Sequence, residues 1–104
     1  MAKAKKKKVS AKGTLIFSSY ERISGLSTVK TLTAPAGTSH AMIQCEAQNV
    51  RWRADGTDPT SAVGMLMKTT DPPLLLEMFP LAGLEFIEVA AGALLNIHYF
   101  KRKV

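Results

Sequence analysis

Apolar and polar residues alternate along several short segments of the chain from Thr28 onward, and turn residues separate these segments. The clearest example is SHAMIQCEA, residues 39–47, in which Ala41, Ile43 and Cys45 share one face. A period of two is typical of a β-strand with one buried face. We therefore predict a strand here, with Ile43 and Cys45 in the core of the protein.

The next segment, NVRWR, continues the alternation and carries the single tryptophan of the chain. Val50 and Trp52 fall on one face of the expected strand, and Arg51 and Arg53 fall on the other. Because register is strongly specified where one face is buried, we predict that Val50 and Trp52 lie between two sheets. The two arginines would then point outward.

Two roles remain open for these outward arginines. Arginine and aromatic side chains together bind single-stranded nucleic acid, in which bases stack on rings and guanidinium groups contact phosphates. The following turn, ADGTDPT, carries Asp55 and Asp58, and either one can brace an arginine without any ligand. Since alternation separates the tryptophan from both arginines, we favour the structural role and keep Arg51 and Arg53 as candidate partner contacts.

Four later segments complete the pattern of strands and turns. VGMLMK, LLLEMF, LEFIEVA and ALLNIHYF are short, apolar and bounded by turn residues. The last two flank the small residues 90–92, which predicts a hairpin, and we place Ile97 in the core. About seven short strands without helical periodicity predict an all-β protein, a small antiparallel β-sandwich of jelly-roll type at residues 28–104.

The N-terminal part of the chain departs from this pattern. Residues 1–13, MAKAKKKKVSAKG, form a low-complexity segment whose like charges repel, so we expect a flexible, extended basic arm. Residues 14–27, TLIFSSYERISGLS, contain apolar residues without a clean period. We expect an irregular docking segment there, with Phe17 and Tyr20 available to a partner.

Length and composition indicate one soluble globular domain. A chain of 104 residues buries a single core, and 46% hydrophobic with 21% charged residues is ordinary for such a protein. No apolar run approaches the roughly 20 residues that span a bilayer, and no apolar stretch follows the basic start as in a secretory signal. We therefore expect no membrane contact, and synthesis and retention in the cytoplasm.

The net charge of +6 is distributed unevenly along the chain. Nine of the 14 basic residues are terminal: Lys3, Lys5, Lys6, Lys7, Lys8, Lys12, Lys101, Arg102 and Lys103. Between residues 13 and 100, five basic residues face eight acidic ones, and five minus eight gives a net charge of −3. The lysine run could contact nucleic acid, an acidic protein surface or only solvent, because lysine binds as a point charge. The opposite sign of the body favours an interaction.

Residue types that carry catalysis or bind metals are sparse. Cys45 is the single cysteine, which excludes an intramolecular disulfide and a cysteine metal cluster. His40 and His98 have no Cys, Asp or second His at ligand spacing, and the DGTD turn lacks the further acids of an EF-hand. No nucleophile elbow or glycine-rich phosphate loop occurs. We expect no enzymatic activity, no cofactor and no bound metal.

Residues 35–67, PAGTSHAMIQCEAQNVRWRADGTDPTSAVGMLM, resemble small virion-associated β-proteins encoded by tailed bacteriophages. The shared pattern is a Pro-Ala-Gly bend, a strand similar to ALIQ, then NVRWR, DGTDPT and a Val-Gly-Met strand. With the closing LLNIHYFK, the resemblance spans most of residues 28–101 and excludes the lysine arm and TLIFSSYERISGLS. It implies a β-sandwich of the capsid decoration, cement or fibre-base kind that forms a symmetric homo-oligomer, with a trimer favoured.

These features together predict a non-enzymatic structural protein of a phage virion, made in the host cytoplasm. Our first hypothesis is a head decoration or cement protein that bridges subunits of the major capsid protein or contacts another virion protein. The lysine arm, Phe17 and Tyr20 would lie on the acidic capsid surface, and the arm would become ordered on binding. Two alternatives stay open: a tail or fibre-attachment component, and a small nucleic-acid-binding β-barrel module that uses the arm, Arg51 and Arg53.

Overall fold

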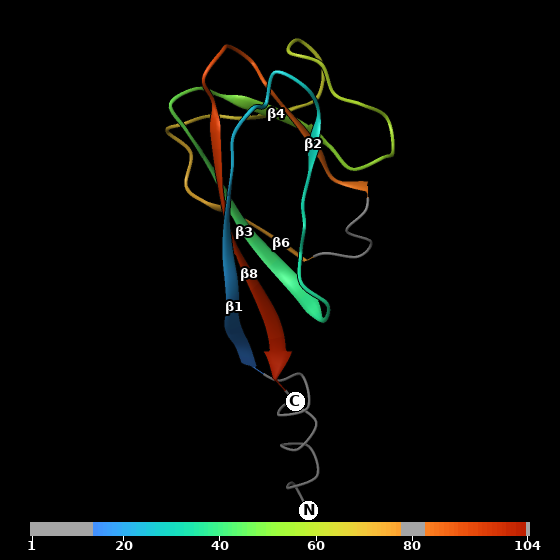
Figure 1. Ribbon diagram of the computed structural model, residues 1–104, viewed down its shortest axis with the longest axis vertical. Coiled ribbons are helices and arrows are strands. Elements are labelled where there is room, and N and C mark those ends of the chain that lie inside the picture. Colours follow the sequence, from blue (N-terminus) through green and yellow to red (C-terminus); the bar gives the residue numbers. More distant parts are fainter. Residues whose placement is uncertain (1–13, 78–82, 104) are drawn as a thin grey trace, which may run out of the picture.

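The computed structural model describes residues 14–77 and 83–103, which form eight β-strands (Figure 1). The strands are β1 (Thr14–Ile23), β2 (Lys30–Thr31), β3 (Thr38–Glu46), β4 (Val50–Arg53), β5 (Met65–Met67), β6 (Leu74–Glu77), β7 (Glu85–Glu88) and β8 (Leu94–Lys103). They form two four-stranded antiparallel sheets: sheet A in the order β1-β8-β3-β6, and sheet B in the order β2-β7-β4-β5. The predicted all-β class with antiparallel sheets is confirmed. No helix in the described residues is long and apolar enough to cross a bilayer.

Side chains of both sheets meet in one hydrophobic core. Ile43, Cys45 and Ile97 of sheet A are buried there, and Val50 of sheet B is buried as well, as the alternation predicted. Trp52, which we predicted to lie between the two sheets, packs against this core but is only partly buried. The core therefore forms where period-two patterns of the two sheets face each other.

β1 corrects the prediction for residues 14–27. Thr14–Ile23 is a ten-residue strand at the edge of sheet A, paired with β8 from Thr14 to Ile23. The register shifts between Phe17 and Ser19, so that outward-facing positions change parity within the strand. Because of this bulge, the apolar residues of the segment do not follow a period of two. The paired strands consequently begin at Thr14, before residue 28, where we predicted that the β-domain starts.

β7 and β8 do not form the predicted hairpin. β7 pairs with β2 and β4 in sheet B, whereas β8 pairs with β1 and β3 in sheet A. The turn between them carries the chain from one sheet to the other. Glu88 stabilises this crossover, because its Oε1 accepts hydrogen bonds from the backbone N–H groups of Gly92 and Ala93.

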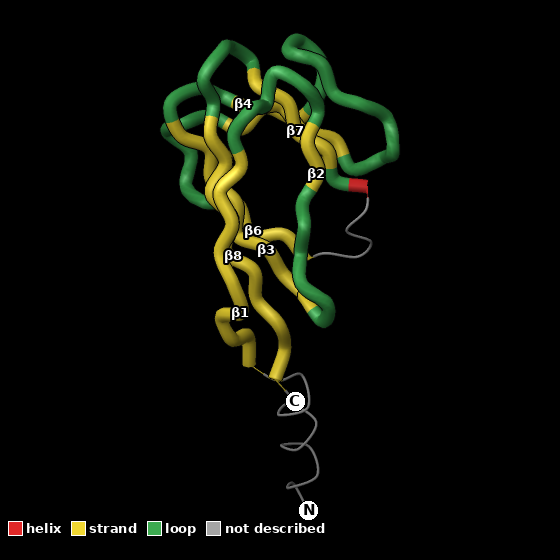
Figure 2. The backbone as a smooth tube through the Cα atoms, viewed as in Figure 1, coloured by secondary structure: helices red, strands yellow, loops and turns green. Residues whose placement is uncertain are grey.

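The first and last strands bring the two ends of the described chain together. Thr14 pairs with Lys103, so β1 begins where β8 ends. Figures 1 and 2 show these strand ends at one end of the molecule, here called the terminal pole, with most loops at the opposite end. Lys101, Arg102 and Lys103 are exposed at this pole. The lysines of residues 1–13, predicted to form a flexible arm, lie outside the described residues.

Candidate functional site

Trp52 and its two neighbouring arginines point to opposite faces of sheet B, as predicted. Trp52 pairs with Phe86, which is fully buried, so the tryptophan ring faces the interior. Arg51 and Arg53, one position away on either side, point to the outer face. A flat platform that combines this ring with both guanidinium groups is therefore not formed.

The two arginines are held by groups of the following loop. Arg53 makes a two-pronged contact with Asp55, with Nε donating to Oδ1 at 3.0 Å and Nη2 donating to Oδ2 at 2.5 Å. The hydrogen bonds from Arg53 lower the pKa of the Asp55 carboxyl to about 2. Arg51 instead donates to the backbone carbonyls of Ser61, at 3.2 Å, and Gly64, at 2.9 Å. The predicted aspartate brace is confirmed for Arg53 and wrong for Arg51.

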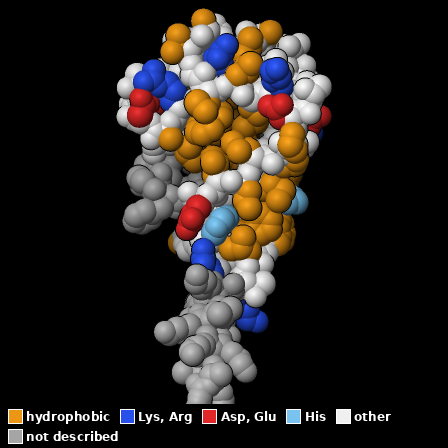
Figure 3. Space-filling model, turned by 180° about the vertical axis from the view of Figure 1, so that it is seen from behind, with side chains coloured by type: hydrophobic (Ala, Val, Ile, Leu, Met, Phe, Trp, Pro, Cys, Tyr) orange, Lys and Arg blue, Asp and Glu red, His pale blue; other side chains and the backbone are white. Residues whose placement is uncertain are grey.

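Trp52 is only partly buried because it lines a hollow of about 340 Å³ beside β5 and β6. Residues of β5, β6 and the turn between them complete the lining: Met65, Leu66, Met67, Asp71, Pro72, Pro73 and Leu74. Met65 is 60% exposed. Figure 3 shows hydrophobic side chains gathered over one face of the molecule, so the described chain leaves apolar area uncovered.

The outer face of sheet A carries a cluster of aromatic rings from β1 and β8. The His98 ring lies edge-on to Phe17, with centroids 5.0 Å apart, and to Tyr20, with centroids 5.1 Å apart. Phe100 lies edge-on to Phe17 at 6.3 Å. Phe17 and Tyr20 are 57% and 50% exposed. The sequence singled out these two residues but missed His98 and Phe100, although alternation in LLNIHYF places both on one face.

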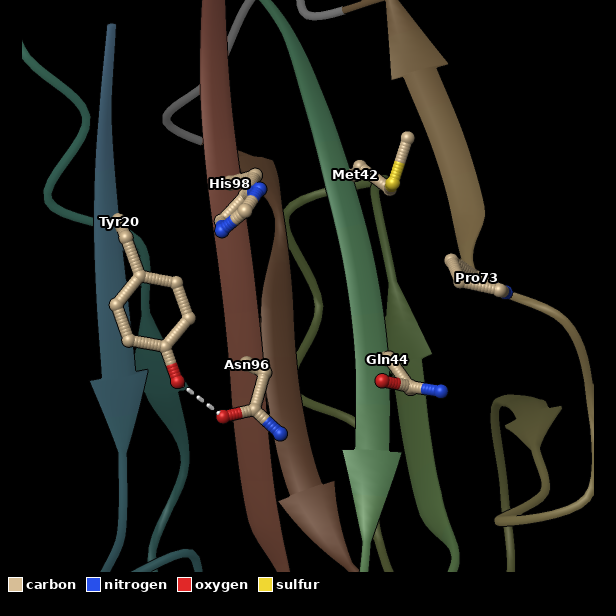
Figure 4. A pocket seen from close by; sticks show the side chains of 6 residues that line it. All are labelled: Tyr20, Met42, Gln44, Pro73, Asn96 and His98. Carbon is tan, nitrogen blue, oxygen red and sulfur yellow. Dashed lines mark hydrogen bonds between the residues drawn. The ribbon is translucent and has the colours of Figure 1, made fainter. Parts of the chain in front are cut away.

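A second hollow, of about 280 Å³, adjoins this cluster (Figure 4). Its lining residues come from β1, β8, β3 and the turn before β6: Tyr20, Asn96, His98, Met42, Gln44 and Pro73. The Tyr20 hydroxyl donates a hydrogen bond to Asn96 Oδ1 at 2.5 Å, and Asn96 Nδ2 donates to Glu46 Oε1 at 2.7 Å. Arg22 lies 3.2 Å from the same Glu46 oxygen. This chain of contacts holds the Tyr20 and Asn96 side chains in position on one side of the hollow.

Glu21 points to the opposite face of β1 from Tyr20, and its contacts are structural. Its carboxylate accepts hydrogen bonds from the Tyr99 hydroxyl and from the hydroxyl and backbone N–H of Thr33. Burial and the hydrogen bond to Glu21 raise the pKa of Tyr99. These contacts join β1, β8 and the segment after β2.

Groups that could bind a metal are not brought together in the described parts of the chain. No set of three or more His, Cys, Asp or Glu side chains there is arranged to hold a metal ion. His40 Nδ1 lies 2.9 Å from Ser39 Oγ, and Cys45 is a buried free thiol whose pKa is raised by burial. The surfaces left to consider are the terminal pole, the aromatic cluster and the two hollows.

Comparison of the chain with protein-family models, with curated proteins and with solved structures found no match. The interpretation of these surfaces therefore depends on their own geometry and charge.

Proposed function

We propose that this protein is a structural component of a tailed-phage virion, a head decoration or cement protein attached by its terminal pole. The observation that carries the proposal is the pairing of Thr14 with Lys103. Three basic residues close β8 at this pole, and six lysines precede Thr14 in the sequence, so nine of the 14 basic residues lie in the sequence segments next to these paired strand ends. Residues 13–100 carry a net charge of −3.

This separation of charge suits attachment to an acidic surface. The pole is attracted to the surface while the body is repelled, so the molecule is oriented as it approaches. Phe17 adds an exposed ring on the face next to the pole, and aromatic residues are enriched in protein interfaces. A combination of apolar contact and positive charge fits the acidic lattice of a major capsid protein.

The strand order supports the same proposal. Sheet order β1-β8-β3-β6 opposite β2-β7-β4-β5 is that of an eight-stranded jelly roll, which we infer as the topology of this sandwich. Jelly rolls occur in viral capsid and lectin domains, although a fold alone does not give a function. The resemblance of residues 35–67 to phage virion proteins agrees with this inference. A symmetric oligomer, with a trimer favoured, would multiply the contacts of the poles.

Nucleic acid is the less favoured partner of the terminal pole. Arg51 and Arg53, the candidates for phosphate contact, are engaged with carbonyls and with Asp55 on sheet B. Lysines without a base-reading element supply only the electrostatic, salt-sensitive part of binding. A tail or fibre-attachment component with the same fold is the other alternative, and it differs from a head protein in copy number.

Quantitative mass spectrometry of gradient-purified virions tests the proposal. Copy numbers are measured against the major capsid protein of the phage that encodes the chain. A head decoration protein is present in hundreds of copies. A few copies per particle would indicate a tail component instead. Absence from purified virions would contradict a structural role in the particle.

A further inference from the structure

The hollow on the outer face of sheet A has two rows of lining side chains, set by strand register. Gln44 lies opposite Asn96, and Met42 lies opposite His98, which in turn pairs with Tyr20. Figure 4 shows the Tyr20 hydroxyl, Asn96 and Gln44 side by side across three neighbouring strands. One row is therefore made of hydrogen-bonding groups, and the other has a thioether and an imidazole beside the tyrosine ring.

Several of these polar groups can make further hydrogen bonds. The Gln44 amide and the His98 imidazole make no hydrogen bond to any described residue. Asn96 is held from both sides by Tyr20 and Glu46, so its amide has a fixed orientation. The Tyr20 hydroxyl donates its hydrogen bond to Asn96, and its oxygen can still accept one from a ligand. Donors and acceptors are thus present at fixed positions next to an exposed ring.

The lining contains no Asp, Glu, Lys or Arg. Glu46, which accepts a hydrogen bond from Asn96, is paired with Arg22 at 3.2 Å, so each charge is partly compensated by the other. A phosphate or a nucleic acid would need cationic donors at this place. A purely apolar ligand would leave the Gln44 amide without a partner, which is costly. The ligand that fits is uncharged, rich in hydroxyl groups and apolar on one face.

We propose that this hollow binds a neutral carbohydrate, with the sugar ring against Tyr20 and its hydroxyls on Gln44, Asn96 and His98. A volume of about 280 Å³ is close to the roughly 300 Å³ at which small-molecule sites begin, and it suits one sugar unit of a short chain. The proposal goes beyond attachment to the capsid and does not depend on it, since attachment uses the terminal pole. Tyr20, first selected as a partner contact, is assigned to the sugar site.

The test is a titration of the ¹⁵N-labelled full chain with maltotriose, cellotriose and chitotriose, followed by NMR. At least one trisaccharide should give saturable shifts at millimolar concentration, centred on Gln44, Asn96 and His98. Gln44→Ala and Asn96→Ala should each weaken that binding about tenfold, because each removes a hydrogen-bonding amide. Gln48→Ala is the matched control, as Gln48 is an exposed glutamine outside the hollow and its loss should leave the affinity unchanged.

Tyr20→Phe keeps the ring and removes only the hydroxyl, so it keeps the test valid if an alanine variant unfolds. It should free Asn96 and weaken binding less than Asn96→Ala does. Three results would overturn the proposal: no saturable shift with any of the three sugars, unchanged affinity in both alanine variants, or tighter binding of inorganic phosphate or a short oligonucleotide at the same residues. Virion copy number is measured separately and does not affect this outcome.

Discussion

Sheet A and sheet B share one core but differ in strand length and in what they present to a partner. Sheet A contains β1 and β8 of ten residues and β3 of nine, whereas the strands of sheet B have two to four residues. The outer face of sheet A exposes Phe17, Tyr20 and a hollow with unused polar groups. On the outer face of sheet B, Arg51 and Arg53 are tied to their own loop.

The contrast separates residues that maintain the fold from residues that are free to bind. A guanidinium group with internal acceptors contributes to the loop conformation and would have to give up those contacts to bind a ligand. An exposed ring or the unpaired Gln44 amide gives up few contacts other than those with water. The longer strands of sheet A also bring both ends of the described chain to the terminal pole. We therefore propose that the binding functions belong to sheet A and the terminal pole, and that sheet B is mainly structural.

The largest expected effect tests whether the two sheets unfold together because they share one core. Phe86→Ala in β7 and Ile97→Ala in β8 both truncate fully buried side chains, one in each sheet. We expect the free energy of unfolding to fall by about 3–5 kcal/mol for phenylalanine and about 2–5 kcal/mol for isoleucine. Urea unfolding followed by circular dichroism measures both values, with exposed-site Gln48→Ala as control. Two separate unfolding transitions would contradict a single core.

Trp52→Ala should have a smaller effect, because the ring is only partly buried beside the 340 Å³ hollow. We expect a loss of about 1–3 kcal/mol, within the usual range for single substitutions and below that of Phe86→Ala. The same urea experiment gives the comparison. A loss equal to that of Phe86→Ala would mean that Trp52 belongs to the closed core after all.

The sequence predicted the parts of the fold that depend on local alternation. The inner and outer faces of β3 and β4 follow from a period of two, and so do the burial of Ile43 and Val50 and the outward direction of both arginines. β1 was missed because a bulge between Phe17 and Ser19 shifts the phase of its side chains. Whether a turn makes a hairpin or a crossover depends on which strands pair, and neighbouring sequence does not encode that directly.

The candidate sites were predictable to a smaller extent. Phe17 and Tyr20 stand out as apolar residues beside a charged arm, but the partners that complete their cluster come from β8. The pairing of Tyr20 with His98 spans most of the chain and is fixed only when the strands assemble. The hollow needs three strands and Pro73 together. No single segment of sequence contains the pattern of such a site.

The pH dependence of stability at alkaline pH tests the structural role of the hydrogen bond between Glu21 and Tyr99. Burial and the hydrogen bond to Glu21 raise the pKa of Tyr99, so the folded state favours the protonated phenol. This stabilisation is complete below the unfolded-state pKa of about 10 and is lost as pH rises through the raised folded-state value. We expect the melting temperature of the wild type to fall above about pH 10 more steeply than that of Tyr99→Phe. Parallel curves for the two proteins would contradict the coupling.

A smaller, local effect is expected in sheet B at low pH. The hydrogen bonds from Arg53 and the Thr57 backbone N–H lower the pKa of Asp55 to about 2. Their contribution is present above the ordinary value of 3.8 and is lost as pH falls toward about 2. Because the pair is exposed, the loop should change without unfolding of the whole protein. The Thr57 amide shift in NMR spectra reports this, and a midpoint at the ordinary pKa would show that the pair does not form.

The central claim is that the terminal pole attaches the protein to an acidic protein lattice. The most direct measurement is cosedimentation with capsids that lack the protein, over a salt series, with duplex DNA assayed in parallel. Wild-type protein should bind capsids, more weakly as salt rises. Replacing Lys5, Lys6, Lys7 and Lys8 with glutamine should remove most of this binding, while Phe17→Ser should weaken it even at low salt. Binding to DNA that persists at physiological salt and requires Arg51 and Arg53, with no capsid binding, would contradict the account.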